Sequence, residues 1–232
     1  MKIIGLTDIH GDVASILRMR DILTGADCIL LAGDITHFGH QRRAKQVLDT
    51  IRGINPHVLA VTGNCDHPDI DDYLNDESIS IHGQAMVREG IGFVGVGASL
   101  ITPFSTPNEM GEENFQRILR EGGSGLAPDI PIVFVSHQPP VDTTLDRLNS
   151  GLHVGSHAVR SFITHRSPLV CLTGHIHEAR GTDRIADTLI LNPGPTASGH
   201  YALVDIRAGQ LVTAEIRTIE DDYRPLDYLP RQ

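Results

Sequence analysis

Carboxylate, amide and imidazole side chains recur where short apolar segments of this sequence end. The five places read DIH (Asp8, His10), GDITH (Asp34, His37), GNCD (Asn64, Cys65, Asp66), SHQPP (His137) and GHIH (His175, His177). One such motif occurs by chance in many chains and by itself indicates only a polar loop. Because all five follow strand-like segments in succession, we predict that they form one shared site.

These residue types are the ones that bind divalent transition metals. The candidate ligands are Asp8, His10, Asp34, Asn64, His137, His175 and His177. Residues two apart in an extended chain point the same way, so each D-x-H or H-x-H pair can reach one cavity. The mixture of imidazole, carboxylate and amide suits Mn, Fe, Zn, Ni or Co better than Mg or Ca. Seven ligands exceed one tetrahedral zinc site and fit two ions that share a carboxylate.

The charge of such a pair of ions predicts the substrate. Two divalent ions bring about +4, two carboxylates about −2 and a bridging hydroxide about −1, which leaves the site near +1. This local charge would attract a phosphate anion although the whole chain carries a formal charge of −10. The spacing therefore predicts a dinuclear hydrolase site.

The elements expected in the first half place these residues at one edge. Strands are predicted at 2–7, 28–32 and 58–62, and amphipathic helices at 12–23 and 40–51. Short apolar strands separated by helices predict a buried sheet of βαβ units, whose carboxyl ends commonly carry ligand sites. Gly33, Gly63 and Gly174 precede candidate ligands, as expected where the backbone turns sharply and approaches another segment closely.

The second half predicts a mixed or antiparallel sheet. Hairpins are expected at 84–88 with 91–97 and at 200–206 with 210–218. Between the hairpins we expect strands at 132–136 and 169–173 and helices at 112–120 and 156–165. We expect a single domain over residues 1–232, with a loosely packed C-terminal tail at 220–232.

The composition restricts location and partners. The chain has 232 residues, 40% of them hydrophobic, and its most apolar later stretch, 91–101, is too short to cross a bilayer. The first predicted strand begins at Lys2, so we expect no leader peptide. Cys28 and Cys171 lie in apolar runs, which indicates reduced core thiols and a cytoplasmic protein.

The net charge of −10 argues against a nucleic-acid polymer as partner. A small phosphorylated substrate is expected, and oligomerisation through edge strands stays open.

The ordered motifs DIH, GDITH, GNCD, SH and GHIH resemble those of the calcineurin-like metallophosphoesterases. The sequence is most similar to their small single-domain branch, related to bacterial cyclic-nucleotide phosphodiesterases. The resemblance implies an α/β fold in which two mixed β-sheets pack as a sandwich with flanking helices, in four layers. It also implies two metal ions, with manganese expected first, and hydrolysis of a phosphoester by a metal-bridging hydroxide.

The resemblance also assigns roles to the candidate residues. Carried over motif by motif, Asp8, His10 and His177 hold one ion, Asn64, His137 and His175 hold the other, and Asp34 bridges them. The implied catalytic set is Asp34, Asn64, Cys65 and Asp66. Asp66 matches an acidic residue that orients a ligand or catalytic histidine, and a helix cap before residues 67–74 is an equally good interpretation.

Cys65 is the main departure from the family pattern, in which a histidine follows the ligand asparagine and protonates the leaving oxygen. A thiol is a weak donor, and losing a general acid commonly lowers a rate by about 10²–10⁴. We therefore expect a preference for diesters or anhydrides whose leaving group needs little protonation. His37, His67, His153 and His157 stay open as replacements for the missing histidine.

Two alternatives to a phosphodiesterase remain open. One is a phosphomonoesterase or protein phosphatase with the same metal centre. The other is a scaffold that keeps the sheets without catalysis. All seven candidate ligands are present, which favours an enzyme.

Overall fold

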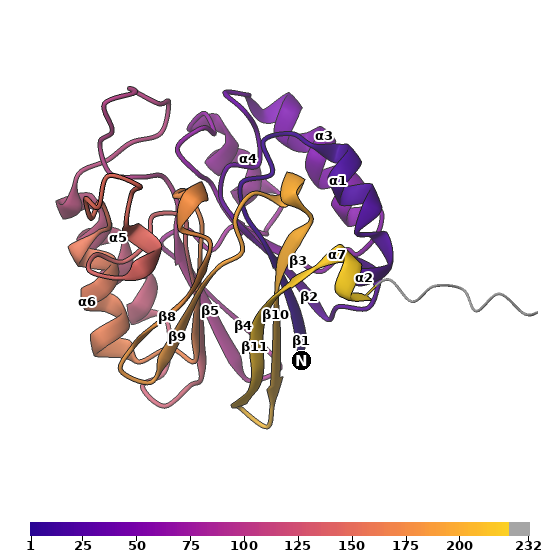
Figure 1. Ribbon diagram of the computed structural model, residues 1–232. Coiled ribbons are helices and arrows are strands. Elements are labelled where there is room, and N and C mark those ends of the chain that lie inside the picture. Colours follow the sequence, from indigo (N-terminus) through magenta and orange to yellow (C-terminus); the bar gives the residue numbers. More distant parts are fainter. Residues whose placement is uncertain (223–232) are drawn as a thin grey trace, which may run out of the picture.

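The central strands are apolar on both faces, so both faces of each sheet must be covered. Residues Cys28–Ala32, Ile91–Val96 and Ile132–Ser136 are buried along their whole length. The computed structural model describes residues 1–222. Two sheets pack face to face with helices on both outer sides, so both faces of these strands are covered (Figure 1). This is the predicted four-layer α/β sandwich.

Strands and helices alternate along most of the chain. The strands are β1 (Lys2–Leu6), β2 (Cys28–Ala32), β3 (Val58–Val61), β4 (Ala85–Arg88), β5 (Ile91–Val96), β6 (Ile132–Ser136), β7 (Val170–Thr173), β8 (Gly181–Ile185), β9 (Thr188–Asn192), β10 (His200–Arg207) and β11 (Gln210–Thr218). The helices are α1 (Val13–Arg18), α2 (Arg20–Thr24), α3 (Gln41–Arg52), α4 (Asp69–Asp76), α5 (Glu112–Ser124), α6 (His157–Arg166) and α7 (Ile219–Asp222), and short 3-10 turns are η1 (Thr144–Asp146), η2 (His177–Ala179) and η3 (Thr196–Ser198).

Both sheets are mixed, as the resemblance implies. The first has the order β11-β10-β1-β2-β3, in which β1, β2 and β3 run parallel and β10 is antiparallel to β1. The second has the order β4-β5-β6-β7-β9-β8, with antiparallel pairs at both edges and a parallel centre. The parallel strands of each sheet therefore bring their carboxyl ends to one edge.

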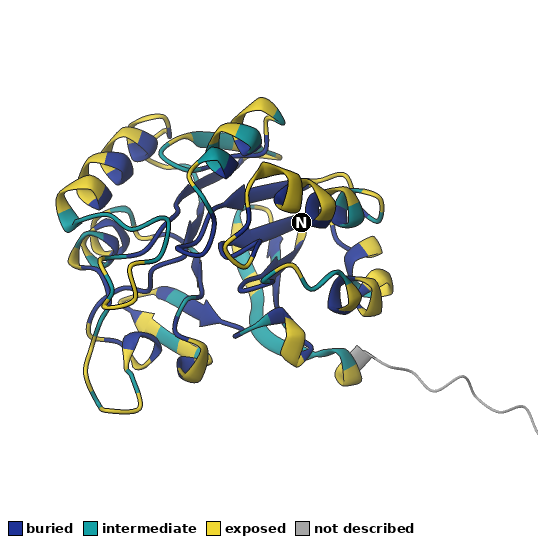
Figure 2. Cartoon of the chain, turned by 90° about the horizontal axis from the view of Figure 1, so that it is seen from above, coloured by how far each residue is buried: buried dark blue, intermediate teal, exposed yellow. Residues whose placement is uncertain are grey.

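Three apolar clusters hold the layers together. Successive strand residues face opposite sides, so Ile3 joins the cluster between the sheets while Ile4 faces the helices α1–α4. Leu30 and Phe93 meet between the sheets, and Phe134 belongs to the cluster beneath α5 and α6. Figure 2 shows the buried strands at the centre and helices whose outer sides are exposed. The inter-sheet cluster fixes how the strand ends of one sheet face those of the other.

Some local predictions were wrong. The helix expected over 12–23 is broken at Met19 into α1 and α2. Met19 is buried in the core, while Leu17 is 47% exposed. The hairpin of β8 and β9 was not predicted, because β8 is an edge strand with alternating polar residues. Of the predicted tail at 220–232, residues 220–222 end α7 and residues 223–232 lie outside the described part. Within residues 1–222, no helix has the length and apolar content needed to cross a membrane.

Candidate metal centre

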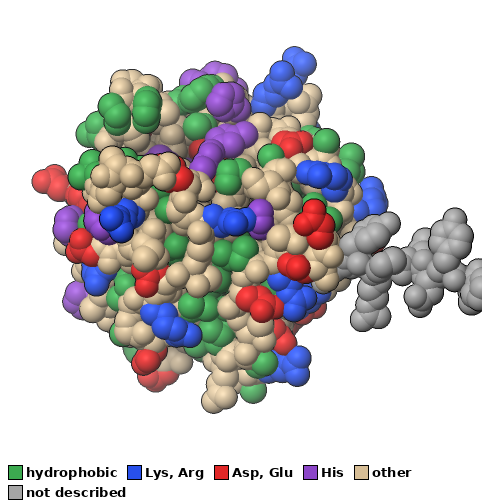
Figure 3. All heavy atoms as spheres, in the orientation of Figure 1, with side chains coloured by type: hydrophobic (Ala, Val, Ile, Leu, Met, Phe, Trp, Pro, Cys, Tyr) green, Lys and Arg blue, Asp and Glu red, His purple; other side chains and the backbone are tan. Residues whose placement is uncertain are grey.

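The seven candidate ligands come from the carboxyl ends of five strands, three in the first sheet and two in the second. Asp8 and His10 follow β1, Asp34 follows β2, Asn64 follows β3, His137 follows β6, and His175 and His177 follow β7. In Figure 3, histidine side chains gather at this edge of the molecule, at the top of the view. Residues from distant parts of the chain thus share one region.

The first group of side chains is Asp8, His10 and His177, whose potential ligand atoms all lie within 4.8 Å of one another. Nε2 of His177 lies 3.2 Å from Oδ1 of Asp8 and 3.3 Å from Nε2 of His10. Burial by itself would raise the pKa of Asp8, but the hydrogen bond from His177 and the nearby His137 and His177 rings lower it to about 2. Asp8 is therefore an anion at neutral pH.

The second group is formed around His137. Asp8, Asp34 and His137 have ligand atoms within 4.8 Å of one another. Nε2 of His137 lies 3.0 Å from Oδ1 of Asn64, and the rings of His137 and His175 lie with their centroids 5.2 Å apart. Burial, with the His137 ring next in effect, lowers the pKa of His175 to about 4, so its imidazole is neutral at pH 7.

Asp34 lies between the two groups. Its Oδ1 is 3.5 Å from Nε2 of His137, and its Oδ2 is 3.8 Å from Nε2 of His10. One carboxylate oxygen therefore faces each group. The backbone N–H of Cys65 donates to Oδ1 at 2.8 Å and fixes the orientation of the carboxylate.

The donor set fits a cation, because several potential ligand atoms face the same space. Nδ1 of His137 lies 2.7 Å from the carbonyl oxygen of Ala32 and donates to it. This bond turns Nε2 toward the other candidate ligand atoms, with Oδ1 of Asn64 at 3.0 Å and Oδ1 of Asp34 at 3.5 Å. A carbonyl bond to the opposite ring nitrogen is the usual support of a histidine ligand.

Backbone strain is concentrated at the same residues. Asp8, His10, Asp34 and His175 have φ values of 51°, 50°, 48° and 68°. Non-glycine residues seldom adopt this left-handed region, although Asp and His do so more often than most. Bonds between strand ends hold the conformation, including His10 N–H to the Asp34 carbonyl at 2.8 Å. Strain of this kind persists where the surrounding structure fixes it, typically at functional sites.

Glycines allow the strand ends to approach this closely. A Cβ on Gly63 would lie within 3.0 Å of the Asp34 carboxylate and backbone, and one on Gly174 would lie within 3.0 Å of Thr7 and Asp8. A Cβ on Gly33 would likewise lie within 3.0 Å of the His137 side chain. The expectation that these three glycines permit close approach is confirmed.

Cys65 is buried beside the candidate ligands. Its Sγ is 3.6 Å from Nδ2 of Asn64. Burial, together with the Asp34 carboxylate, raises the pKa of the thiol, so Cys65 stays protonated at neutral pH. Cys65 also forms a group with His10 and His37 in which potential ligand atoms lie within 4.8 Å of one another.

Of the four histidines considered as replacements, His37 lies in that group with Cys65. The ring of His67 stacks on His40 with centroids 3.8 Å apart, and His153 Nδ1 lies 2.8 Å from Oδ1 of Asp146. His157 begins α6 and lines a separate cavity. Of these four, His37 is the one that shares a group of potential ligand atoms with Cys65.

Asp66 is fully buried and binds backbone rather than a ligand histidine. Its Oδ1 accepts from the N–H and hydroxyl of Thr36, both at 2.8 Å, and its Oδ2 accepts from the N–H groups of Ile35 at 3.0 Å and Gly63 at 2.9 Å. It does not cap α4, whose first turn follows Pro68. Asp66 therefore ties the loop after β2, which carries Asp34, to the loop after β3, which carries Asn64.

Two threonines support the cluster and were not predicted. The hydroxyl of Thr7 donates to Oδ2 of Asp8 at 2.8 Å. Thr106 accepts from Nδ2 of Asn64 at 3.1 Å, which turns the amide oxygen of Asn64 toward His137. Thr106 lies in a proline-containing loop far from the motifs, so no spacing in the sequence points to it.

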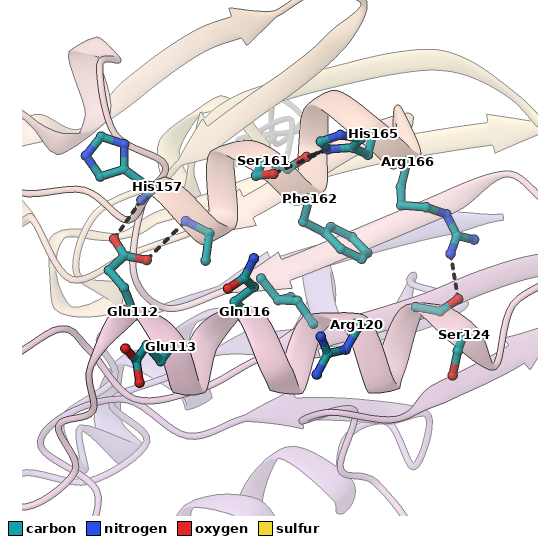
Figure 4. A pocket seen from close by; sticks show the side chains of 13 residues that line it. Glu112, Glu113, Gln116, Arg120, Ser124, His157, Ser161, Phe162, His165 and Arg166 are labelled. Atoms are coloured by element: carbon teal, nitrogen blue, oxygen red, sulfur yellow. Dashed lines mark hydrogen bonds between the residues drawn. The ribbon is translucent and has the colours of Figure 1, made fainter.

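A separate cavity of about 640 Å³ lies between α5 and α6, on the outer face of the second sheet (Figure 4). Its wall includes Glu112, which accepts bonds from the N–H groups of His157 and Ala158 at 2.7 and 3.0 Å. None of the seven candidate ligands lines it, so its size does not make it the reactive site.

The chain is similar to known proteins in sequence and in fold. The family model described as calcineurin-like phosphoesterase matches residues 1–179. An uncharacterized protein of Methanocaldococcus jannaschii is 36% identical over 218 residues, which cover 91% of this chain and 95% of that protein. A crystal structure of a protein from Thermus thermophilus is similar with a TM-score of 0.68 and 21% identity, over 94% of this chain and 98% of that chain. A dimetal phosphatase from Danio rerio is similar with a TM-score of 0.55 and 14% identity, over 90% and 93%.

The bonds of Asp66 predict a loss of stability on Asp66→Asn. Whichever way the amide turns, its NH₂ group faces two donors, and leaving these unpaired costs about 2–4 kcal/mol. For a chain of this size we expect the Tm to fall by roughly 5–15 °C in calorimetry. The control is Asp129→Asn, an exposed aspartate whose loss should leave Tm within about 2 °C. Equal Tm values for the two variants would contradict the role given to Asp66.

Proposed function

This chain belongs to the calcineurin-like phosphoesterase family, and on that premise we propose that it is a phosphodiesterase acting on a small nucleotide-like or otherwise activated diester. Metal-dependent phosphoester hydrolysis is the activity of the family, and its members depend on two metal ions. The observation that carries the proposal is the Asp34 carboxylate, with one oxygen toward each of two groups of candidate ligands.

In this proposal, Asp8, His10 and His177 would hold one ion, Asn64, His137 and His175 would hold the other, and Asp34 would serve both. When bound, the ions supply Lewis acidity and a lowered pKa for water, with manganese proposed ahead of Fe, Zn, Ni or Co. The protein keeps the ligands in place before binding: Cys65 N–H orients Asp34, the Ala32 carbonyl sets the tautomer of His137, and Thr106 orients Asn64.

The preference for diesters is proposed from the leaving group. Hydrolysis breaks a phosphorus–oxygen bond, adds the oxygen of water to phosphorus and transfers a proton to the departing oxygen. Cys65 is a weak donor in the position where the family has a histidine. A diester with an aryl or strained leaving group needs that proton least, which supports a diester over an alkyl monoester.

Location and partners are part of the same proposal. All three cysteines are buried and unpaired, which supports a reducing compartment such as the cytoplasm. The partner is a small phosphorylated molecule. A phosphomonoesterase with the same centre is the second candidate, and a scaffold without catalysis is the third.

Metal content and turnover separate an enzyme from a scaffold. We expect about two ions per chain by elemental analysis after loading with Mn²⁺, and hydrolysis of bis(p-nitrophenyl) phosphate that chelation abolishes. Asp34→Asn should lower the metal content and reduce turnover by roughly 10²-fold or more, whereas Asp129→Asn should change neither. If the unaltered protein bound no metal and hydrolysed no diester, the scaffold alternative would be established.

Cys65→His tests the basis of the substrate preference. A histidine there restores a proton donor, so we expect hydrolysis of an alkyl monoester such as a nucleoside monophosphate to rise relative to that of bis(p-nitrophenyl) phosphate, by about tenfold or more. The ratio of kcat/KM values is the measurement. If this ratio stays constant while the variant retains its metal, the missing donor is not what sets the preference.

His37→Ala tests whether His37 takes over proton donation. A lost donor matters most for poor leaving groups, so we expect kcat for a methyl or nucleoside diester to fall about tenfold or more, with a smaller fall for the nitrophenyl diester. His67→Ala is the matched control, since His67 stacks on His40 instead. Equal losses for good and poor leaving groups would remove His37 from this role.

A further inference from the structure

A cavity of about 570 Å³ adjoins the candidate metal centre on the side of the first sheet. It lies between the loop after β1, the loop after β2 and the start of α3, and its wall includes His10, Thr36, His37, Phe38, Arg42 and Arg43. His10 belongs both to this wall and to the first group of candidate ligands. A molecule bound at the metal centre can therefore extend into this cavity.

The cavity is cationic although the protein is acidic. Among the described residues, no aspartate or glutamate lines it, whereas two exposed arginines do. Within residues 1–222, neither Arg42 nor Arg43 has a carboxylate partner; the side chain of Arg43 reaches only Gln46, at 3.5 Å. Two guanidinium groups with no carboxylate partner in the described part of the chain, in a protein of net charge −10, form a local complement to an anion.

The position of the arginines strengthens this interpretation. Arg42 and Arg43 lie in the first turn of α3, which has 12 residues and no acidic residue in that turn. Cations at a helix N-terminus oppose the helix dipole, so they weaken the helix unless an anion is present. A phosphate in the cavity would be attracted by both guanidinium groups and by the dipole.

Phe38 gives the cavity an aromatic wall. Its side chain is 49% exposed, and its φ of 55° is unusual for a bulky residue. The N–H of Phe38 donates to the carbonyl oxygen of Cys65 at 2.9 Å, and its ring lies 4.5 Å from the ring of His37. The loop thus holds an apolar ring open to solvent beside the reactive site, where it can pack against a planar ring.

We propose that this cavity binds one nucleotide unit of the substrate, with its phosphate on Arg42 and Arg43 and its base against Phe38. This inference rests on the proposed function and deepens it. The substrate class is then a short dinucleotide with a terminal phosphate, whose internal diester lies at the metal centre and whose leaving oxygen would take its proton from His37 in the same wall. A plain aryl diester lacks both features that the cavity recognises.

The test compares 5′-phosphorylated diadenylate with diadenylate lacking that phosphate. Charge-assisted contacts to a phosphate predict that the unaltered protein favours the phosphorylated form by about tenfold or more in kcat/KM and in Kd. Arg42→Gln combined with Arg43→Gln should reduce this preference to within about twofold. Phe38→Ala should weaken binding of both dinucleotides by roughly tenfold.

Arg20→Gln is the control, because Arg20 is an exposed arginine that lines no part of the cavity and it should leave the preference unchanged. Kd is measured by calorimetry on chelated protein, so binding is read without turnover, and Tm confirms that each variant is folded. Equal Kd values for the two dinucleotides in the unaltered protein would overturn the cavity's role. A tenfold preference in Kd without hydrolysis of any diester would support the cavity and reject the proposed function.

Discussion

The packing of one sheet against the other is the constraint on which the site depends. Neither sheet carries a complete group of candidate ligands. Asp8 and His10 extend from the first sheet toward His177 of the second, and Asp34 and Asn64 face His137 across the same junction. The apolar cluster between the sheets, with Leu30 and Phe93, therefore sets distances of 3–4 Å between polar atoms that lie beyond its edge.

The close approach has a cost in backbone freedom and in electrostatics. Four candidate ligands take left-handed conformations, and side chains larger than hydrogen have no room at Gly63 and Gly174. Buried carboxylates and imidazoles are placed together although burial disfavours charge on each. Asp66 stabilises this arrangement through hydrogen bonds from backbone N–H groups, and Thr7 and Thr106 stabilise it through hydrogen bonds with the side chains of candidate ligands.

The motifs that could be read from the sequence are those in which chemistry follows directly on a strand. Asp8, Asp34 and His137 could be found because short apolar runs predict buried strands, and parallel strands end at one edge. The role of Asp66 could not, since its donors in Ile35 and Thr36 are brought near only by folding. Thr106 and Phe38 lack a local signal for the same reason. The break at Met19 was missed because periodicity detects a buried side and not a change of helix axis.

The sharing of each ligand group between the two sheets has a mechanical consequence. An ion bound by Asp8 and His177 would link the two sheets at their carboxyl-end edge, beyond the apolar cluster that packs between them. Because the ligands come together only in the folded protein, metal binding would raise the free energy needed to separate the two sheets. The protein's resistance to unfolding and its supply of metal would then be one linked quantity.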